Sequence, residues 1–343
     1  MINAVMLGAI AASGRLPVPA EAFEAAILAG KSAEANLRGF KAGFEAAHPG
    51  AASPPPSPKT GRDAELEAEA TQFGIAAEFV TEGLRRLAAY QDASYARLYL
   101  DRLAPIAEAD ARAGVDGHLT REVARHLALR MSYEDVIRVA QAKIAPERMA
   151  RIIAQAGGKP GEPVTVVEFL KPGIAELCSL LPPAIARPII ATAERRGWID
   201  RLYWGMEIKT TSVSGYLRLR LLAGLRRFRP RTYRYCQEQT AIEAWLTLIR
   251  AAAAKSAALA LEIAECARLI KGYGDTLKRG AANYAAIERQ VIRPILAGAI
   301  PLSRGIDAVA SARAAALTDP DGEGLAACLA EIGRAHTLDD VAE

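Results

Sequence analysis

The chain has little of what most cofactor sites require. Its 343 residues include four histidines and four cysteines, and Cys178, Cys236, Cys266 and Cys328 lie far apart with no CxxC pair. Iron–sulfur and zinc sites need such ligands at short, repeated spacing. We therefore expect no iron–sulfur cluster and no metal in this chain, and mostly buried, reduced thiols of the kind found in cytoplasmic proteins.

Two further absences narrow the function. No uncharged apolar run approaches the ~20 residues that a transmembrane helix needs, so we expect no membrane span. Neither a GxGxxG after a predicted strand nor a Walker pattern occurs. The nearest phosphate-loop candidate is Lys271-Gly-Tyr-Gly-Asp275. It is either a helix end followed by an N-cap, or a nest of backbone N–H groups that binds an anion beside Lys271.

Alanine and leucine are abundant, and 51% of the residues are hydrophobic, which favours helices. Two stretches are exceptions. Val164 to Leu170 is rich in β-branched residues on both faces and predicts a buried strand, and residues 203–213 predict a second strand. The predicted fold class is therefore mostly α, a helical domain with a small β-sheet element (α+β).

The positions of helix-breaking and proline-rich segments predict how the chain divides into domains. Residues 1–48 predict three short helices, too few for a good core, and their apolar start should pack against something else, including a partner. Residues 49–61 are rich in proline and predict a semi-rigid spacer. Residues 62–343 then form the helical domain with the small sheet. Within it we expect one long helix over residues 78–109, and helices capped by Thr120, by the run Ser132 to Asp135, and by a capping box at Thr240.

The excess positive charge of the chain is concentrated in one stretch. Between Arg201 and Arg234 there are nine Lys or Arg residues against one acid, Glu207, whereas the whole chain has a net charge of +4. Tyrosine, tryptophan and phenylalanine are interleaved with these cations, so a solvated tail is not expected. A segment this polarised must meet anionic groups or stay fully solvated.

The stretch also predicts a helix. Leu217, Leu221, Gly224, Leu225 and Phe228 recur at helical spacing as one apolar stripe, with arginines along both flanks and Pro230 at the end. The candidate partner-binding or anion-binding residues of the chain are Arg218, Arg220, Arg226, Arg227, Arg229, Arg231, Arg234, Lys271 and Asp275.

Four interpretations of the basic stretch stay open. As a nucleic-acid site, it would contact phosphates and stack on bases, although the rest of the chain is net acidic and no nucleic-acid motif occurs. As a subunit interface, its arginines would meet a partner's carboxylates. As a ligand site, two or three arginines would hold a phosphate or carboxylate. As a purely structural feature, they would pair with the chain's own acids.

No catalytic constellation is evident. His126 falls in a predicted helix, and His48, His118 and His336 fall near element ends. None of them has a serine, cysteine or carboxylate partner that the spacing identifies, so structural or surface histidines are expected. Catalytic residues are therefore not assigned.

Several segments resemble a known family. LTREVARHLALRMSYEDVIRVA (119–140), VVEFLKPG (166–173), the block from Glu194 to Tyr235, and AECARLIKGYGDT (264–276) are similar to the C-terminal region of the indolepyruvate ferredoxin oxidoreductase beta subunit. Residues 3–27 resemble the last helices of the 2-oxoacid oxidoreductase gamma-type domain that precedes this region.

The resemblance implies a heteromeric enzyme. Such enzymes convert an aryl 2-oxoacid, coenzyme A and oxidised ferredoxin into acyl-CoA, carbon dioxide and reduced ferredoxin. It places thiamine diphosphate and the iron–sulfur clusters in a partner alpha subunit, with no cofactor in this chain. It also implies that residues 1–48 are the C-terminal remnant of an α/β domain. A misplaced gene start, a split protein and a separate helical module all remain open, as does a stand-alone, non-catalytic binding module that uses the arginines to bind an acidic protein, coenzyme A phosphates or nucleic acid.

Overall fold

The structure, a computed structural model, describes residues 2–13, 18–30, 33–47, 61–156, 164–199, 201–272 and 274–340. The chain separates into two compact units, Met1–Lys59 and Thr60–Glu343. The boundary between them falls inside the predicted proline-rich spacer, and that spacer lies outside the described residues up to residue 60.

The first unit contains three helices, α1 (Ile2–Ala12), α2 (Ala20–Leu28) and α3 (Ala33–Ala46). α1 packs closely on α3 because two glycines face the partner backbone. A Cβ atom at Gly8 would lie 1.9 Å from the carbonyl oxygen of Phe40, and one at Gly43 would lie 1.9 Å from that of Val5. The apolar start of the chain therefore packs on α3, while Met6 stays exposed. That the unit is a remnant of an α/β domain stays a prediction.

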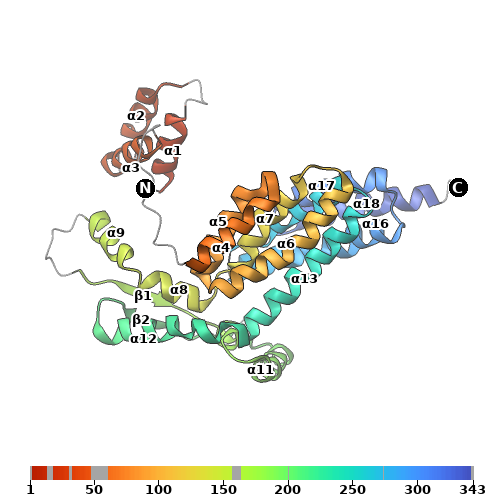
Figure 1. Cartoon of the computed structure of the whole chain (residues 1–343). Helices are drawn as coiled ribbons and strands as arrows, with labels where there is room; N and C mark the ends of the chain where they lie inside the picture. The colour runs from red at the N-terminus through yellow and green to blue at the C-terminus, as the bar shows by residue number, and fades with distance from the viewer. Residues whose placement is uncertain are drawn as a thin grey trace. The chain divides into compact units, whose positions relative to one another are not determined.

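The larger part of the second unit is a helical bundle built from two stretches that are distant in sequence (Figure 1). The first stretch contains α4 (Gly61–Ala70), η1 (Thr71–Ala76), α5 (Ala77–Tyr90), α6 (Ala93–Ala113) and α7 (His118–Met131). The second contains α13 (Tyr233–Ala253), α14 (Ala257–Glu265), η3 (Cys266–Leu269), α15 (Gly274–Ile287), η4 (Glu288–Ile292, a π-helical turn), α16 (Arg293–Ala297), α17 (Leu302–Thr318) and α18 (Glu323–Asp340).

The main hydrophobic core joins these two stretches, and none of its buried members in the described ranges lies between residues 132 and 241, although partly buried Tyr235 packs against it. Trp245 is at its centre. The ring of Trp245 is fully buried, its Nε1 donates to the carbonyl oxygen of Ile263 at 3.1 Å, and the guanidinium of Arg130 lies 5.0 Å from the ring centroid. These contacts hold α7, α13 and α14 together.

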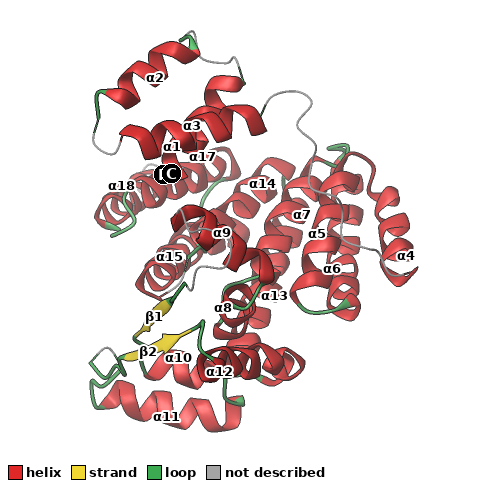
Figure 2. Cartoon of the chain, turned by 90° about the vertical axis from the view of Figure 1, so that its left-hand side faces the viewer, coloured by secondary structure: helices red, strands yellow, loops and turns green. Residues whose placement is uncertain are grey.

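Residues 136–231 form a separate part of the second unit, which we call the insert. It contains α8 (Val136–Lys143), α9 (Pro146–Ala156), β1 (Val167–Leu170), α10 (Ile174–Ser179), α11 (Pro183–Arg195), β2 (Met206–Lys209), α12 (Val213–Gly224) and η2 (Leu225–Arg231). It has its own small core around Ile174, Cys178, Ala186 and Ala193. Figure 2 shows the two strands beside α10, α11 and α12.

The predicted fold class, mostly α with a small β element, is confirmed. β1 and β2 pair antiparallel, with Val167 opposite Lys209 and Leu170 opposite Met206. The prediction that the first strand is buried on both faces was wrong. Phe169 is 75% exposed, because the sheet has two strands and nothing in the described ranges covers this side chain.

Three predicted helix boundaries are also corrected. The long helix expected over 78–109 is two helices, because Asp92 accepts from the Tyr95 amide and caps α6. Buried Asp110 caps α7 from a distance, accepting from the amides of Gly117 and Thr120 at 2.7 Å each. α13 begins at Tyr233 behind Thr232, so the predicted capping box at Thr240 lies inside it. The cap of α8 falls within the predicted run Ser132 to Asp135: Asp135 is the cap, whereas Ser132 ends α7.

Among the described residues, none of the helices combines the length and apolarity that a membrane crossing requires. The cytoplasmic location stays a prediction.

Candidate docking surface

Residues 213–231 of the basic stretch fold into α12 and η2, and most of the predicted apolar stripe faces outward. Leu221 is 74% exposed, Leu217 56% and Phe228 55%. The side that faces inward carries Gly215 and Leu219 instead, and α12 packs on α8. Gly215 fixes this orientation, because a Cβ atom there would lie 2.0 Å from the Lys209 carbonyl oxygen.

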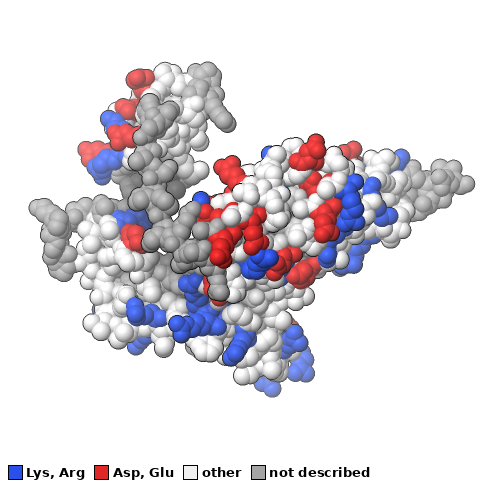
Figure 3. Space-filling view, viewed as in Figure 1, with Lys and Arg blue, Asp and Glu red and all other residues white. Residues whose placement is uncertain are grey.

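Four of the predicted arginines are exposed along these two elements: Arg218, Arg220, Arg227 and Arg231. None of the four forms an ion pair with any residue of the described ranges. On the face drawn in Figure 3, Lys and Arg lie among uncharged atoms in the lower part of the second unit, while over the bundle Asp and Glu are mixed with Lys and Arg. We use the name arginine face for the following exposed residues of α12 and η2: Tyr216, Leu217, Arg218, Arg220, Leu221, Arg227, Phe228 and Arg231.

Arg229 does not belong to this face, which corrects the prediction. Its side chain is fully buried and its Nε and Nη2 donate to the Asp135 carboxylate at 2.7 and 3.1 Å. Nη1 donates to the carbonyl oxygen of Tyr90 at 2.9 Å and to Gln91 Oε1 at 2.8 Å. Burial opposes the charge, but the bonds to Asp135 raise the pKa of Arg229 above its ordinary value. Arg229 therefore anchors η2 to the bundle.

Arg226 and Arg234 are also engaged within the chain. Arg226 donates to the carbonyl oxygens of Ala88 and Gln91, and its burial lowers its pKa. Arg234 pairs with Glu238 one turn further along α13, at 2.6 Å. The purely structural interpretation, pairing with the chain's own acids, therefore holds for Arg229 and Arg234. Arg226 is held by backbone carbonyl oxygens instead, and the four residues of the arginine face pair with no acid of the described ranges.

Lys271 and Asp275 are separate from these residues. They belong to the bundle, at the junction of η3 and α15, where Gly272 has φ +76° and Asp275 lies in the first turn of α15. Asp275 pairs with Lys278 at 3.6 Å. This arrangement matches a helix end and a new helix start. The backbone nest is not tested, because Tyr273 lies outside the described residues.

Apolar exposure is concentrated in the insert. Fourteen of the twenty-four large hydrophobic side chains that are exposed in the described ranges lie between Phe169 and Phe228. Contiguous apolar patches on the surface of globular proteins mark binding sites, and arginine with large aromatic and apolar side chains is typical of interface centres. The insert is therefore the part of the chain best suited to docking.

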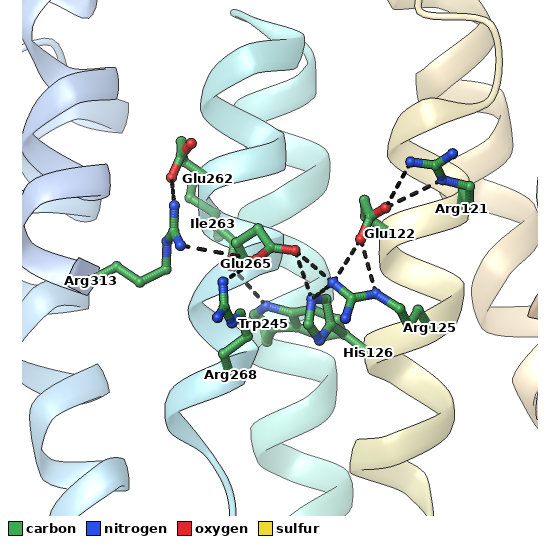
Figure 4. Close-up of polar contacts among 10 residues, drawn as sticks. All are labelled: Arg121, Glu122, Arg125, His126, Trp245, Glu262, Ile263, Glu265, Arg268 and Arg313. Carbon is green, nitrogen blue, oxygen red and sulfur yellow. Dashed lines mark hydrogen bonds and ion pairs between the residues drawn. The ribbon is translucent and has the colours of Figure 1, made fainter. Parts of the chain in front are cut away.

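A second polar cluster lies in the bundle, between α7 and α14 (Figure 4). Nη2 of Arg125 lies 2.8 Å from Glu122 Oε2, 2.9 Å from Glu265 Oε1 and 3.0 Å from His126 Nε2. Glu122, His126 and Glu265 together form a ligand set that a metal ion would accept. The guanidinium nitrogen already lies where such an ion would be. That the chain holds no metal stays a prediction.

The contacts of His126 conflict with one another. The Arg125 nitrogen can only donate, and the Glu265 carboxylate can only accept, yet each lies 3.0 Å from the same Nε2. One nitrogen cannot serve both. Burial, assisted by the Arg125 charge, lowers the pKa of His126. Burial acts in the opposite direction on Glu265, but its bond to His126 and the nearby cations bring its pKa below the ordinary value.

Sequence reasoning missed this cluster. The i, i+4 spacing of Glu122 and His126 was visible as a possible pair on one helix face. Glu265 follows 139 residues after His126, and only the packing of α14 on α7 brings it into contact.

A model of a protein family of unknown function, DUF6537, matches residues 76–290. The chain belongs to this family. No curated protein and no solved structure matches the chain. The part of the chain that is characteristic of DUF6537 contains the whole insert, with the arginine face, and also the cluster around His126. Both features therefore belong to the family region of the chain, whereas the first unit lies outside it.

Proposed function

We propose that the protein is a non-catalytic subunit of an indolepyruvate-type 2-oxoacid:ferredoxin oxidoreductase and docks on the catalytic subunit through the arginine face. In this proposal, the alpha subunit carries thiamine diphosphate and the iron–sulfur clusters. Coenzyme A is the co-substrate, ferredoxin accepts the electrons, and the assembly is cytoplasmic. The enzyme class rests on the resemblance of residues 119–140, 166–173, 194–235 and 264–276 to that family.

One observation supports docking. Arginines without ion pairs to described residues lie on the same short elements as exposed Leu217, Leu221 and Phe228. Exposed apolar area gains free energy when a partner covers it, by roughly 25 cal/mol per Å² before the costs of association. Guanidinium groups beside it favour a partner with carboxylates, which they bind in bidentate geometry. The surface therefore suits an acidic partner with an apolar centre.

The test is co-purification with the alpha-type subunit. The double variant Arg218→Glu/Arg227→Glu reverses two charges on the arginine face without touching the anchor Arg229. We expect it to lower the yield of complex at least about tenfold, because the new carboxylates oppose the partner's acids. The matched control is Arg112→Glu/Arg289→Glu, which makes the same charge change at exposed positions in the bundle.

The outcomes separate the two parts of the proposal. Full complex formation by a folded Arg218→Glu/Arg227→Glu variant would overturn docking through this face. Failure of the unaltered chain to bind the alpha-type subunit, or to support 2-oxoacid-dependent reduction of ferredoxin with it, would overturn the enzyme assignment.

The exposed arginines also favour a second candidate, a stand-alone anion-binding module. The same groups would hold the phosphates of coenzyme A or the acidic face of ferredoxin. Calorimetry at low salt should then give a heat that weakens as salt is added and is absent in the double variant. A mobility-shift assay with a steep salt slope would instead indicate nucleic acid.

A further inference from the structure

The insert contains an open apolar groove that is separate from α12 and η2. It has a volume of about 660 Å³ and lies between α10, α11 and the residues Trp198, Leu202 and Trp204. Cys178 and Ala193 form its buried floor. Its rim consists of side chains that are each 40 to 47% exposed: Leu177, Ile189, Trp198, Leu202 and Trp204.

Backbone bonds hold the walls of this groove in place. The Trp198 amide donates to the carbonyl oxygen of Ala193 at 2.8 Å, at the end of α11. The Trp204 amide donates to the carbonyl oxygen of Pro172 at 3.0 Å, and Tyr203 bridges to Gly173 just before α10. The groove is therefore already formed in the unbound chain, so binding need not order its walls.

The lining offers almost nothing to a polar ligand. Thr192 is the one polar side chain besides the Trp ring nitrogens, and its hydroxyl donates to the carbonyl oxygen of Pro188 at 2.7 Å. Sites for small polar ligands normally carry several placed donors or acceptors that orient the ligand. This groove instead suits a row of apolar side chains.

The surroundings of the groove are basic. The guanidinium of Arg196 lies 4.7 Å from the centroid of the Trp198 ring, and the amine of Lys171 lies 5.3 Å from that of Tyr203. Arg187 and Arg195 are exposed on α11 and outnumber its one acid, Glu194. An occupant that places carboxylates beside its apolar side chains would complement these cations.

We propose that this groove binds an amphipathic helix of a partner protein, with leucine-like side chains on one face and acidic residues along its flanks. A helix presents apolar side chains at i, i+3, i+4 and i+7, which is how helices enter apolar grooves between other helices. This site goes beyond the proposed function, because it does not depend on the arginine face or on the identity of the enzyme.

The probe is a fluorescein-labelled 15-residue helical peptide with leucine on one face and glutamate on the others, followed by anisotropy on the full-length protein. A second peptide carries lysine in place of glutamate. We expect the glutamate peptide to bind and the lysine peptide to bind at least tenfold more weakly at low salt. Leu202→Asp should lower the affinity for the glutamate peptide at least tenfold. Leu129→Asp is the matched control, an exposed leucine on α7 of the bundle.

Three results would overturn the proposal. The first is the absence of an anisotropy change with the glutamate peptide at high micromolar protein. The second is equal binding of the peptide by the folded Leu202→Asp variant and the unaltered chain. The third is displacement of the peptide by dodecanoate at a lower concentration than by unlabelled peptide, which would assign the groove to an acyl chain. The Arg218→Glu/Arg227→Glu variant should bind the peptide like the unaltered chain, so failure of arginine-face docking and failure of this site are distinguishable.

Discussion

Replacing Arg229 with methionine should destabilise the second unit strongly, although the residue lies in the most basic part of the chain. The substitution keeps the length of the apolar stem and removes the guanidinium. It leaves the nearly buried Asp135 carboxylate without its counter-ion. It also removes the donors to the Tyr90 carbonyl oxygen and to Gln91 Oε1, and the cation 4.1 Å from the centroid of the Tyr90 ring.

The size of the effect follows from what stays buried. Breaking one partner of a buried ion pair costs about 3–5 kcal/mol, because an uncompensated charge remains. Asp135→Asn removes that charge, and its side-chain oxygen can still accept from the Arg138 amide at the start of α8. The double variant Asp135→Asn/Arg229→Met should therefore cost about 1–2 kcal/mol less than the sum of the single changes.

Urea unfolding followed by tryptophan fluorescence measures these costs, since Trp198, Trp204 and Trp245 all lie in the second unit. Arg227→Met is the control, and as an exposed change it should stay within about 0.5 kcal/mol of the unaltered chain. A loss below about 1 kcal/mol for Arg229→Met, or additive costs in the double variant, would refute the anchoring role of Arg229.

Two further predictions concern the cluster between α7 and α14. Burial lowers the pKa of His126 below the ordinary 6.5, so the unfolded chain takes up a proton at this residue at a higher pH than the folded chain does. The free energy of unfolding should therefore fall as the pH drops below about 6.5, by at most about 1.4 kcal/mol per pH unit. In urea unfolding between pH 7 and 5, His126→Gln should remove this slope, and exposed His118→Gln should keep it. Arg125→Ala should bind Zn²⁺ at least about tenfold more tightly than the unaltered chain in calorimetry, because it uncovers three converging ligands.

Either result can contradict the geometry of this cluster. An unchanged pH slope in His126→Gln would show that another group titrates there. Equal zinc binding with and without Arg125 would show that the guanidinium does not occupy the ion's place. The matching control is Arg125→Ala/His126→Gln, which should lose the tighter zinc binding expected of Arg125→Ala.

The fold class was predictable because it depends on local signals. The β-branched run before Leu170 and the run around Ile208 gave the two strands, and the run Ser132 to Asp135 gave the start of α8. The boundary between α5 and α6 was less predictable, since Asp92 interrupts an apolar pattern that otherwise continues. Thr120 looked like an N-cap, but the cap of α7 is a carboxylate from the preceding helix.

The sequence predicted which stretch carries the positive charge of the candidate site, but not which side of its helix faces the solvent. The excess of arginine identified the right stretch, but periodicity alone could not tell which side of α12 faces inward, because Leu217 and Leu219 lie on different sides of the helix and are equally apolar. Gly215 decides this, through its approach to Lys209. The buried position of Arg229 depends on Asp135, 94 residues earlier, and the pairing of His126 with Glu265 likewise needs the tertiary fold.

The helix α13 joins the insert to the bundle as one continuous rod. Its first turn meets the insert, where the Tyr233 amide donates to the carbonyl oxygen of Leu181, and its later turns carry Trp245 and Ile249 into the main core (Figure 1). At 21 residues it spans about 30 Å. The helix therefore fixes the rotation of the insert relative to the bundle about the helix axis. Inserting a single residue in the middle of α13 would rotate one end about 100° relative to the other. A partner bound to the insert would therefore be held at a fixed orientation relative to the bundle.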